Sequence, residues 1–73
     1  MQKGAIVRLK SVKGPLLGIA PEVNYEVTRV KNGGGAAECI NLKNTKTGFQ
    51  VVDPHDGLSP ADYASEFFEE VRH

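Results

Sequence analysis

The chain has 73 residues, of which 40% are hydrophobic and 25% are charged. These fractions are those of a globular domain, and the length is that of one small domain, so we expect a single folded domain. The sequence has no apolar run of the roughly 18 residues that a membrane span needs, and the amino-terminal segment lacks the hydrophobic stretch of a signal peptide. We therefore expect a cytoplasmic protein without membrane contact. The single cysteine, Cys39, excludes an internal disulfide and a multi-cysteine zinc site.

The formal net charge of zero conceals an uneven distribution of charge along the chain. Residues 1–46 contain eight basic and three acidic side chains, a net charge of +5, whereas residues 47–73 contain one basic and six acidic side chains, a net charge of −5. If the two parts form separate surfaces, each can attract a partner of opposite sign. If they pack side by side, the two fields partly cancel.

Four segments have the pattern of β-strands. Residues 5–10 and residues 36–44 alternate in polarity, as half-buried strands do. Residues 25–31 are rich in aromatic and β-branched side chains and are followed by an Asn-Gly turn signal. Residues 49–52 resume the alternation after a polar loop. Between the first two strands, the glycines and prolines of residues 11–24 predict a loop rather than a helix.

The last segment, residues 59–72, predicts a short amphipathic helix with an acidic face. Ser59 suits the cap of a helix and Pro60 its first position. The apolar residues that follow recur with helical spacing, and carboxylates occupy the other face. An alternative interpretation makes residues 61–65 a turn and residues 67–71 a closing strand, because Phe67, Glu69 and Val71 also alternate with their neighbours.

Short strands joined by tight turns predict a mainly β fold in a single domain, residues 1–73. We expect a small antiparallel barrel, or a strongly bent sheet of four or five strands, with the short C-terminal helix. The opening residues resemble the KOW-type motif of Src-homology-3-like small barrels in ribosomal and transcription-elongation proteins; they are Lys3-Gly4, Val7-Arg8-Leu9, Gly14-Pro15, Gly18 and Tyr25-Glu26-Val27. The resemblance covers about the first 30 residues. It implies a barrel that binds RNA or the transcription or translation machinery.

The sequence contains no constellation of catalytic residues. Cys39 lies in an expected strand, far along the chain from His55, and is interpreted as a small buried hydrophobe. Asp53, His55 and Asp56 belong to Asp-Pro and Asp-Gly turns, so we predict a turn there and no metal site. The glycine runs lack the lysine and the following helix of a phosphate-binding loop. We therefore predict no enzymatic activity, no cofactor and no small-molecule substrate.

Two binding hypotheses follow. The favoured one is a monomeric adaptor module that docks on a larger protein and modulates a transcription or translation machine. Its expected partner-binding residues are Asp62, Glu66, Phe67, Glu69 and Glu70. The alternative is a KOW-like domain that binds RNA or DNA through its basic strands and loops. The residues expected to do so are Arg8, Lys10, Lys13, Arg29, Lys31, Lys43 and Lys46. Both hypotheses require the two signs of charge to form separate exposed patches.

Overall fold

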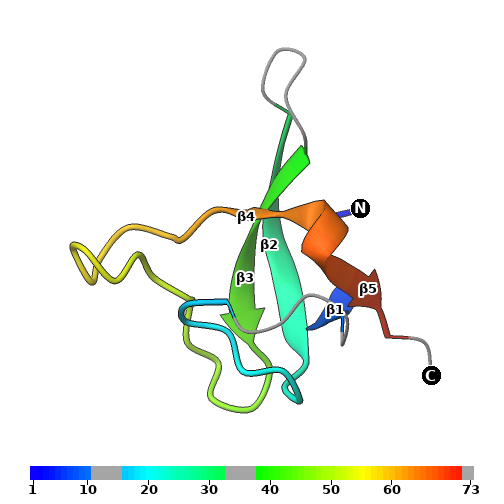
Figure 1. Cartoon of the computed structure of the whole chain (residues 1–73), viewed down its shortest axis with the longest axis horizontal. Coiled ribbons are helices and arrows are strands. Elements are labelled where there is room, and N and C mark those ends of the chain that lie inside the picture. The colour runs from blue at the N-terminus through cyan, green and yellow to red at the C-terminus, as the bar shows by residue number, and fades with distance from the viewer. Residues whose placement is uncertain (11–15, 33–37, 72–73) are drawn as a thin grey trace.

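The computed structural model describes residues 1–10, 16–32 and 38–71 of the chain. These residues form one antiparallel sheet of five strands in the order β4-β3-β2-β1-β5 (Figure 1). The strands are β1 (Ile6–Leu9), β2 (Tyr25–Asn32), β3 (Glu38–Asn44), β4 (Tyr63–Ala64) and β5 (Phe68–Glu70), and the 3-10 turn η2 (Ser65–Phe67) joins β4 to β5. The mainly β class that the sequence predicts is confirmed.

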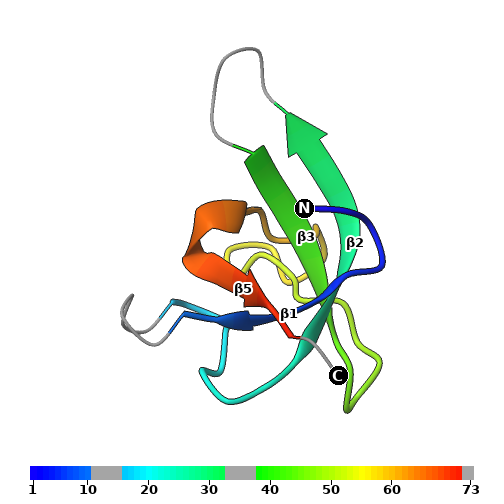
Figure 2. The ribbon, with the colours of Figure 1, turned by 90° about the vertical axis from the view of Figure 1, so that its right-hand side faces the viewer.

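The sheet is bent and stays open. Its edge strands are β4 and β5, and no pairing joins them in the part of the chain that the structure describes. Figure 2 shows the long β2–β3 hairpin running at a steep angle to β1, with β5 beside β1. β4 has only two residues and β5 only three, too few for a continuous ladder between the two edges. The closed form of the predicted fold, a barrel, is therefore wrong, whereas a bent sheet of five strands agrees with the structure.

The helix predicted over residues 59–72 is also wrong. The chain there forms β4, η2 and β5, so the alternative interpretation, a terminal strand, comes closer. Pairing with β1 decides the conformation: the Lys10 amide donates to the Phe67 carbonyl at 2.9 Å, and the Val71 amide donates to the Ile6 carbonyl at 2.8 Å. This pairing buries Phe68 in the core, and such tertiary contacts override local spacing. No helix among the described residues has the length and apolarity to cross a membrane.

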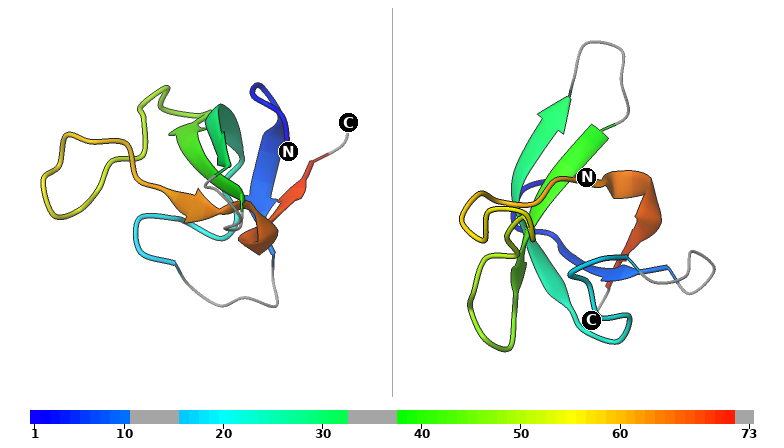
Figure 3. Two further views of the ribbon diagram at one scale, coloured as in Figure 1. Left: turned by 90° about the horizontal axis from the view of Figure 1, so that it is seen from above. Right: turned by 60° about the vertical axis from the view of Figure 1, so that its left-hand side comes forward.

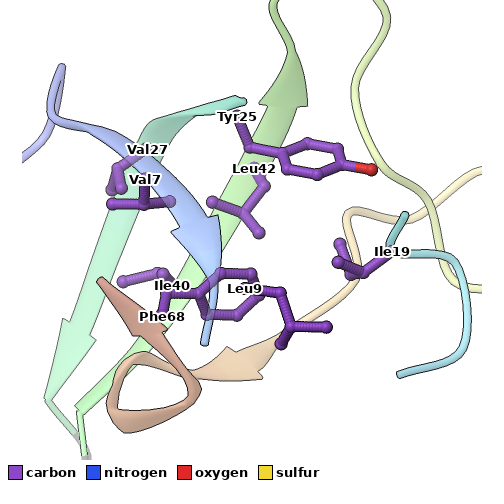
Figure 4. Packing of buried hydrophobic residues seen from close by; sticks show 8 residues of the cluster. All are labelled: Val7, Leu9, Ile19, Tyr25, Val27, Ile40, Leu42 and Phe68. Carbon is purple, nitrogen blue, oxygen red and sulfur yellow. The ribbon is translucent and has the colours of Figure 1, made fainter. Parts of the chain in front are cut away.

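The hydrophobic core lies on one face of the sheet. Alternate residues of the three longest strands point into it, which confirms the strands predicted near residues 5–10, 25–31 and 36–44. Ile19 joins the core from the β1–β2 connection, where the Ala20 amide donates to the Tyr25 hydroxyl at 3.0 Å. Figure 4 shows the eight buried side chains of the cluster, which are Val7, Leu9, Ile19, Tyr25, Val27, Ile40, Leu42 and Phe68.

The strand predicted at residues 49–52 is present only in part. Gln50 forms an isolated bridge with Lys43, and the Val51 amide donates to the Leu42 carbonyl at 2.8 Å, so this segment begins to extend beside β3. Residues 53–60 then leave the sheet as a loop, and pairing with β3 resumes at β4. Figure 3 shows this loop projecting away from the sheet. The Ala61 amide closes its base by donating to the Val51 carbonyl at 3.0 Å.

Candidate docking surface

Charged side chains of opposite sign alternate across four neighbouring strands. Glu69 of β5 lies opposite Arg8 of β1, with 3.8 Å between carboxylate oxygen and guanidinium nitrogen. Glu26 of β2 lies opposite Lys43 of β3, with 3.7 Å between oxygen and ammonium nitrogen. All four side chains are substantially exposed, so each pair stabilises the fold by about 1 kcal/mol at most. The pairs matter more for recognition than for stability, because alternating charges of opposite sign prevent a strong positive field across these strands.

A third ion pair occupies Asp62 within the chain. The Lys31 ammonium donates to the Asp62 carboxylate at 3.1 Å, and the side-chain amide of buried Asn41 donates to the same oxygen at 2.7 Å. That amide also donates to the Ala61 carbonyl at 2.8 Å. The hydrogen bonds from Asn41 and then Lys31 hold the pKa of Asp62 below its ordinary value. Asp62 therefore fixes the chain just before β4, at the sheet edge opposite β5.

The other four residues expected to bind a partner lie together around β5. Glu69 pairs with Arg8, and Phe67 is half-buried against the core. Glu66, in η2, and Glu70, at the end of β5, are exposed. Neither of these two carboxylates forms an ion pair with a described residue. The structure therefore brings these four residues together and separates Asp62 from them.

The residues expected to bind nucleic acid do not form one basic patch. Arg8, Lys31 and Lys43 each pair with a carboxylate. The other described members are dispersed: Lys10 follows β1, Arg29 is exposed on β2, and Lys46 is exposed in the hairpin after β3, whereas Lys13 lies outside the described residues. Separate basic and acidic patches are therefore wrong as a description of the strands, because the register interleaves the two signs.

A groove of about 610 Å³ lies beside β5 and the end of β1. Sequence reasoning missed it, because its walls come from three distant segments. The β1–β2 connection contributes two exposed residues, and Figure 2 shows residues 16–24 of that connection, in cyan, passing below β1. The described residues that line it are Arg8, Leu9, Pro21, Glu22 and Glu69. Among these described residues, two carboxylates face one guanidinium, a net negative charge.

Among the described residues, three large apolar side chains are exposed, and each lies in a connection rather than on the sheet. Leu17 lies between β1 and β2, Phe49 in the hairpin after β3, and Leu58 in the loop of residues 53–60. The sequence places Phe49 in a strand, but its side chain is 76% exposed. An exposed ring in a hairpin suits contact with a partner better than packing in the core.

The described residues contain no group of three or more histidine, cysteine, aspartate or glutamate side chains that could hold a metal ion. The surface instead offers an open sheet edge, exposed carboxylates beside it and an adjacent groove. No protein-family model, curated protein or solved structure matches the chain.

Proposed function

We propose that the protein is a non-enzymatic adaptor that docks on a larger protein through the β5 side of its sheet. The observation that carries this proposal is the contrast in charge pairing: Glu66 and Glu70 stand exposed at the edge, whereas three basic side chains of the sheet are paired. Exposed charges at an interface increase the association rate and favour partners of opposite sign. The partner surface is therefore basic.

The backbone of β5 supports docking by strand addition. Phe67 and Val71 bond to β1, so by the alternation of an antiparallel ladder Glu69 also faces β1. Phe68 and Glu70 therefore direct their backbone groups to the outer edge. The Phe68 amide donates to the Ser65 carbonyl. The Phe68 carbonyl and the amide and carbonyl of Glu70 therefore remain for a partner strand.

The carboxylates at this edge also disfavour a second copy of the chain as the partner. Antiparallel pairing of two β5 strands would bring Glu70 of one copy near acidic residues of the other, and charged side chains at an edge oppose such pairing. A monomer that binds a different, basic protein fits this arrangement.

In this proposal, the sheet is an open form of the Src-homology-3-like barrel that the opening residues resemble. Its support is the pairing of the first strand with both the second and the last, together with a 3-10 turn directly before the last strand. The KOW-type resemblance favours a partner in the transcription or translation machinery.

Charge reversal at the edge tests the docking proposal. The wild-type chain and a Glu66→Lys/Glu70→Lys variant are immobilised and exposed to lysate of the source cell, with Arg29→Glu/Lys46→Glu as the matched control. We expect a defined protein to be retained by the wild type and the control and lost with the edge variant. Equal retention by all three chains, or retention of no protein at low salt, would contradict the proposal.

A second candidate, single-stranded RNA binding, is favoured by the hairpin of residues 44–49. Its tip is ordered by Asn44, whose side-chain oxygen accepts from the Lys46 amide at 2.8 Å and from the Thr47 amide at 3.3 Å. It presents one exposed ring, Phe49, and one exposed cation, Lys46, the two components that stack bases and neutralise phosphate. Binding of oligouridine that weakens with salt and with Phe49→Ala would support this candidate over the first, and no binding at low salt would eliminate it.

A further inference from the structure

We infer that the groove beside β5 receives one arginine side chain from the protein partner. The inference rests on the proposed docking function and deepens it, because it names the chemistry of the segment that docks. Three properties of the groove carry it: its apolar and acidic lining, the loose internal ion pair within it, and its position on the strand that forms the open edge.

The lining suits a long cationic side chain. A volume of about 610 Å³ is ample for one side chain and lies within the range of ordinary ligand sites. Exposed Pro21 supplies an apolar wall for the aliphatic stem of an arginine, whereas the side chain of Leu9, which also lines the groove, is buried in the core. Glu22 and Glu69 come from two separate elements and supply carboxylate oxygens for its head group. A planar guanidinium with five donors can serve two such acceptors at once, which an ammonium does less well.

The ion pair already present in the groove can yield to an incoming cation. The guanidinium of Arg8 is 3.8 Å from the Glu69 carboxylate, longer than a hydrogen bond, and both side chains are 49% exposed. Such a contact is weak, so a partner arginine can approach Glu69 without breaking a short bond. An anionic ligand is disfavoured because, among the described lining residues, the two carboxylates outnumber Arg8.

The groove and the open edge share one strand. Glu69 lines the groove, and its neighbours Phe68 and Glu70 direct backbone groups outward. A partner segment that pairs with β5 lies about 4.8 Å from that strand, a span that an arginine side chain can cross. Strand pairing therefore supplies affinity, and the groove selects segments that carry the cation at the right position.

The test is a titration of the ¹⁵N-labelled full chain with blocked pentapeptides, Ala-Ala-Arg-Ala-Ala and its citrulline counterpart, which keeps the shape of arginine without its charge. We expect saturable chemical-shift changes at the amides of Leu9, Glu22 and Glu69 with the arginine peptide, and much weaker binding of the citrulline peptide. Absence of saturable changes at these amides, or equal binding of the two peptides, would overturn the inference.

Two single variants complete the test. Removing one acceptor of a charge-assisted hydrogen bond by Glu22→Gln should weaken the arginine peptide by about fivefold to tenfold. The matched control Glu26→Gln removes a carboxylate of β2 that lies outside the groove lining and should leave binding unchanged. Equal effects of the two variants would count against the groove. If lysate capture still depends on Glu66 and Glu70 but the peptide does not bind, only the groove inference fails; if capture fails altogether, the docking function fails.

Discussion

The interleaved charged face, which runs from β3 to β5, and the outer edge of the sheet at β5 carry similar kinds of charged residues with opposite consequences. On the face, strand register places Arg8 beside Glu69 and Lys43 beside Glu26. At the edge, no strand lies beyond β5 in the described part of the chain, so Glu70 of β5 and Glu66 of η2 have no neighbouring strand to supply a cation. In this sheet, charged side chains therefore stay unpaired as a group only where the strands end.

The largest expected effect comes from the polar contact that secures the chain opposite the β5 edge. Asn41→Ala removes the donor to the Ala61 carbonyl and to Asp62 and leaves a buried carbonyl without its partner, which should lower the free energy of unfolding by about 2 kcal/mol. Urea denaturation measures it. The edge variant Glu66→Gln/Glu70→Gln should change stability by less than about 0.5 kcal/mol. Equal losses of unfolding free energy in the two variants would contradict the view that Asn41 stabilises the fold and the edge carboxylates do not.

The connection that carries one wall of the groove should respond almost as strongly. Gly18 has φ +84°, and a Cβ there would lie 2.9 Å from the Tyr63 hydroxyl oxygen, which itself donates to the Leu17 carbonyl at 2.8 Å. Gly18→Ala should therefore cost strain plus displacement of that hydroxyl, about 2 kcal/mol in thermal unfolding.

Gly4→Ala is the matched control for this strain. Gly4 has φ +93°, but a Cβ there would meet no atom within 4 Å. Gly4→Ala should therefore lower the free energy of unfolding only through backbone strain, by about 1 kcal/mol. Equal costs for the two variants would show that the Tyr63 contact does not position the connection.

The three strongest elements of the fold are predictable from the sequence, and the two edges are not. Alternation identifies strands because core residues such as Val7 and Leu9 face one side. It cannot identify the terminal strand, since residues 59–72 fit helical spacing as well as alternation and pairing with β1 decides between them. Nor does it reveal where residues 53–60 interrupt the strand beside β3.

The candidate surface was predictable only as a set of residues. Glu66, Phe67, Glu69 and Glu70 do gather around β5. Which charged residues pair with one another depends on strand register. β2 and β3, for example, shift register between Val27 and Arg29, and no pattern of residue types indicates such a shift. The contact of Lys31 with Asp62, and the groove between Glu22 and Glu69, follow from that folded geometry alone.

Acidification should weaken the fold through two carboxyl groups that are held by other groups of the chain. The amino terminus and then Ser65 lower the pKa of Glu38, and Asn41 and then Lys31 lower that of Asp62. A group with a depressed pKa stabilises the fold above its ordinary pKa, here 4.5 and 3.8, and that contribution is lost as pH falls through the folded value. Denaturation from pH 6 to about pH 2 should therefore show falling stability.

One variant tests the contribution of Asp62 in this pH series. Asp62→Asn should flatten the dependence of stability on pH, because the group with the depressed pKa is removed. A profile as steep as that of the wild type would contradict the stabilising role of the Asp62 carboxylate.

The smallest expected effect belongs to the exposed pair Glu26–Lys43. A double-mutant cycle with Glu26→Gln and Lys43→Gln should give a coupling energy of about 0.5 kcal/mol or less, and less still at high salt. A value above about 1 kcal/mol would mean that the interleaved charges stabilise the sheet rather than only neutralise it.

The most direct test of the account compares two immobilised polymers, heparin and poly-lysine, at about 50 mM salt. An exposed acidic edge beside an internally neutralised face predicts that poly-lysine retains the chain, that heparin does not, and that Glu66→Gln/Glu70→Gln releases it from poly-lysine. Retention by heparin, with none by poly-lysine, would show that the basic residues form the open surface and would contradict the account.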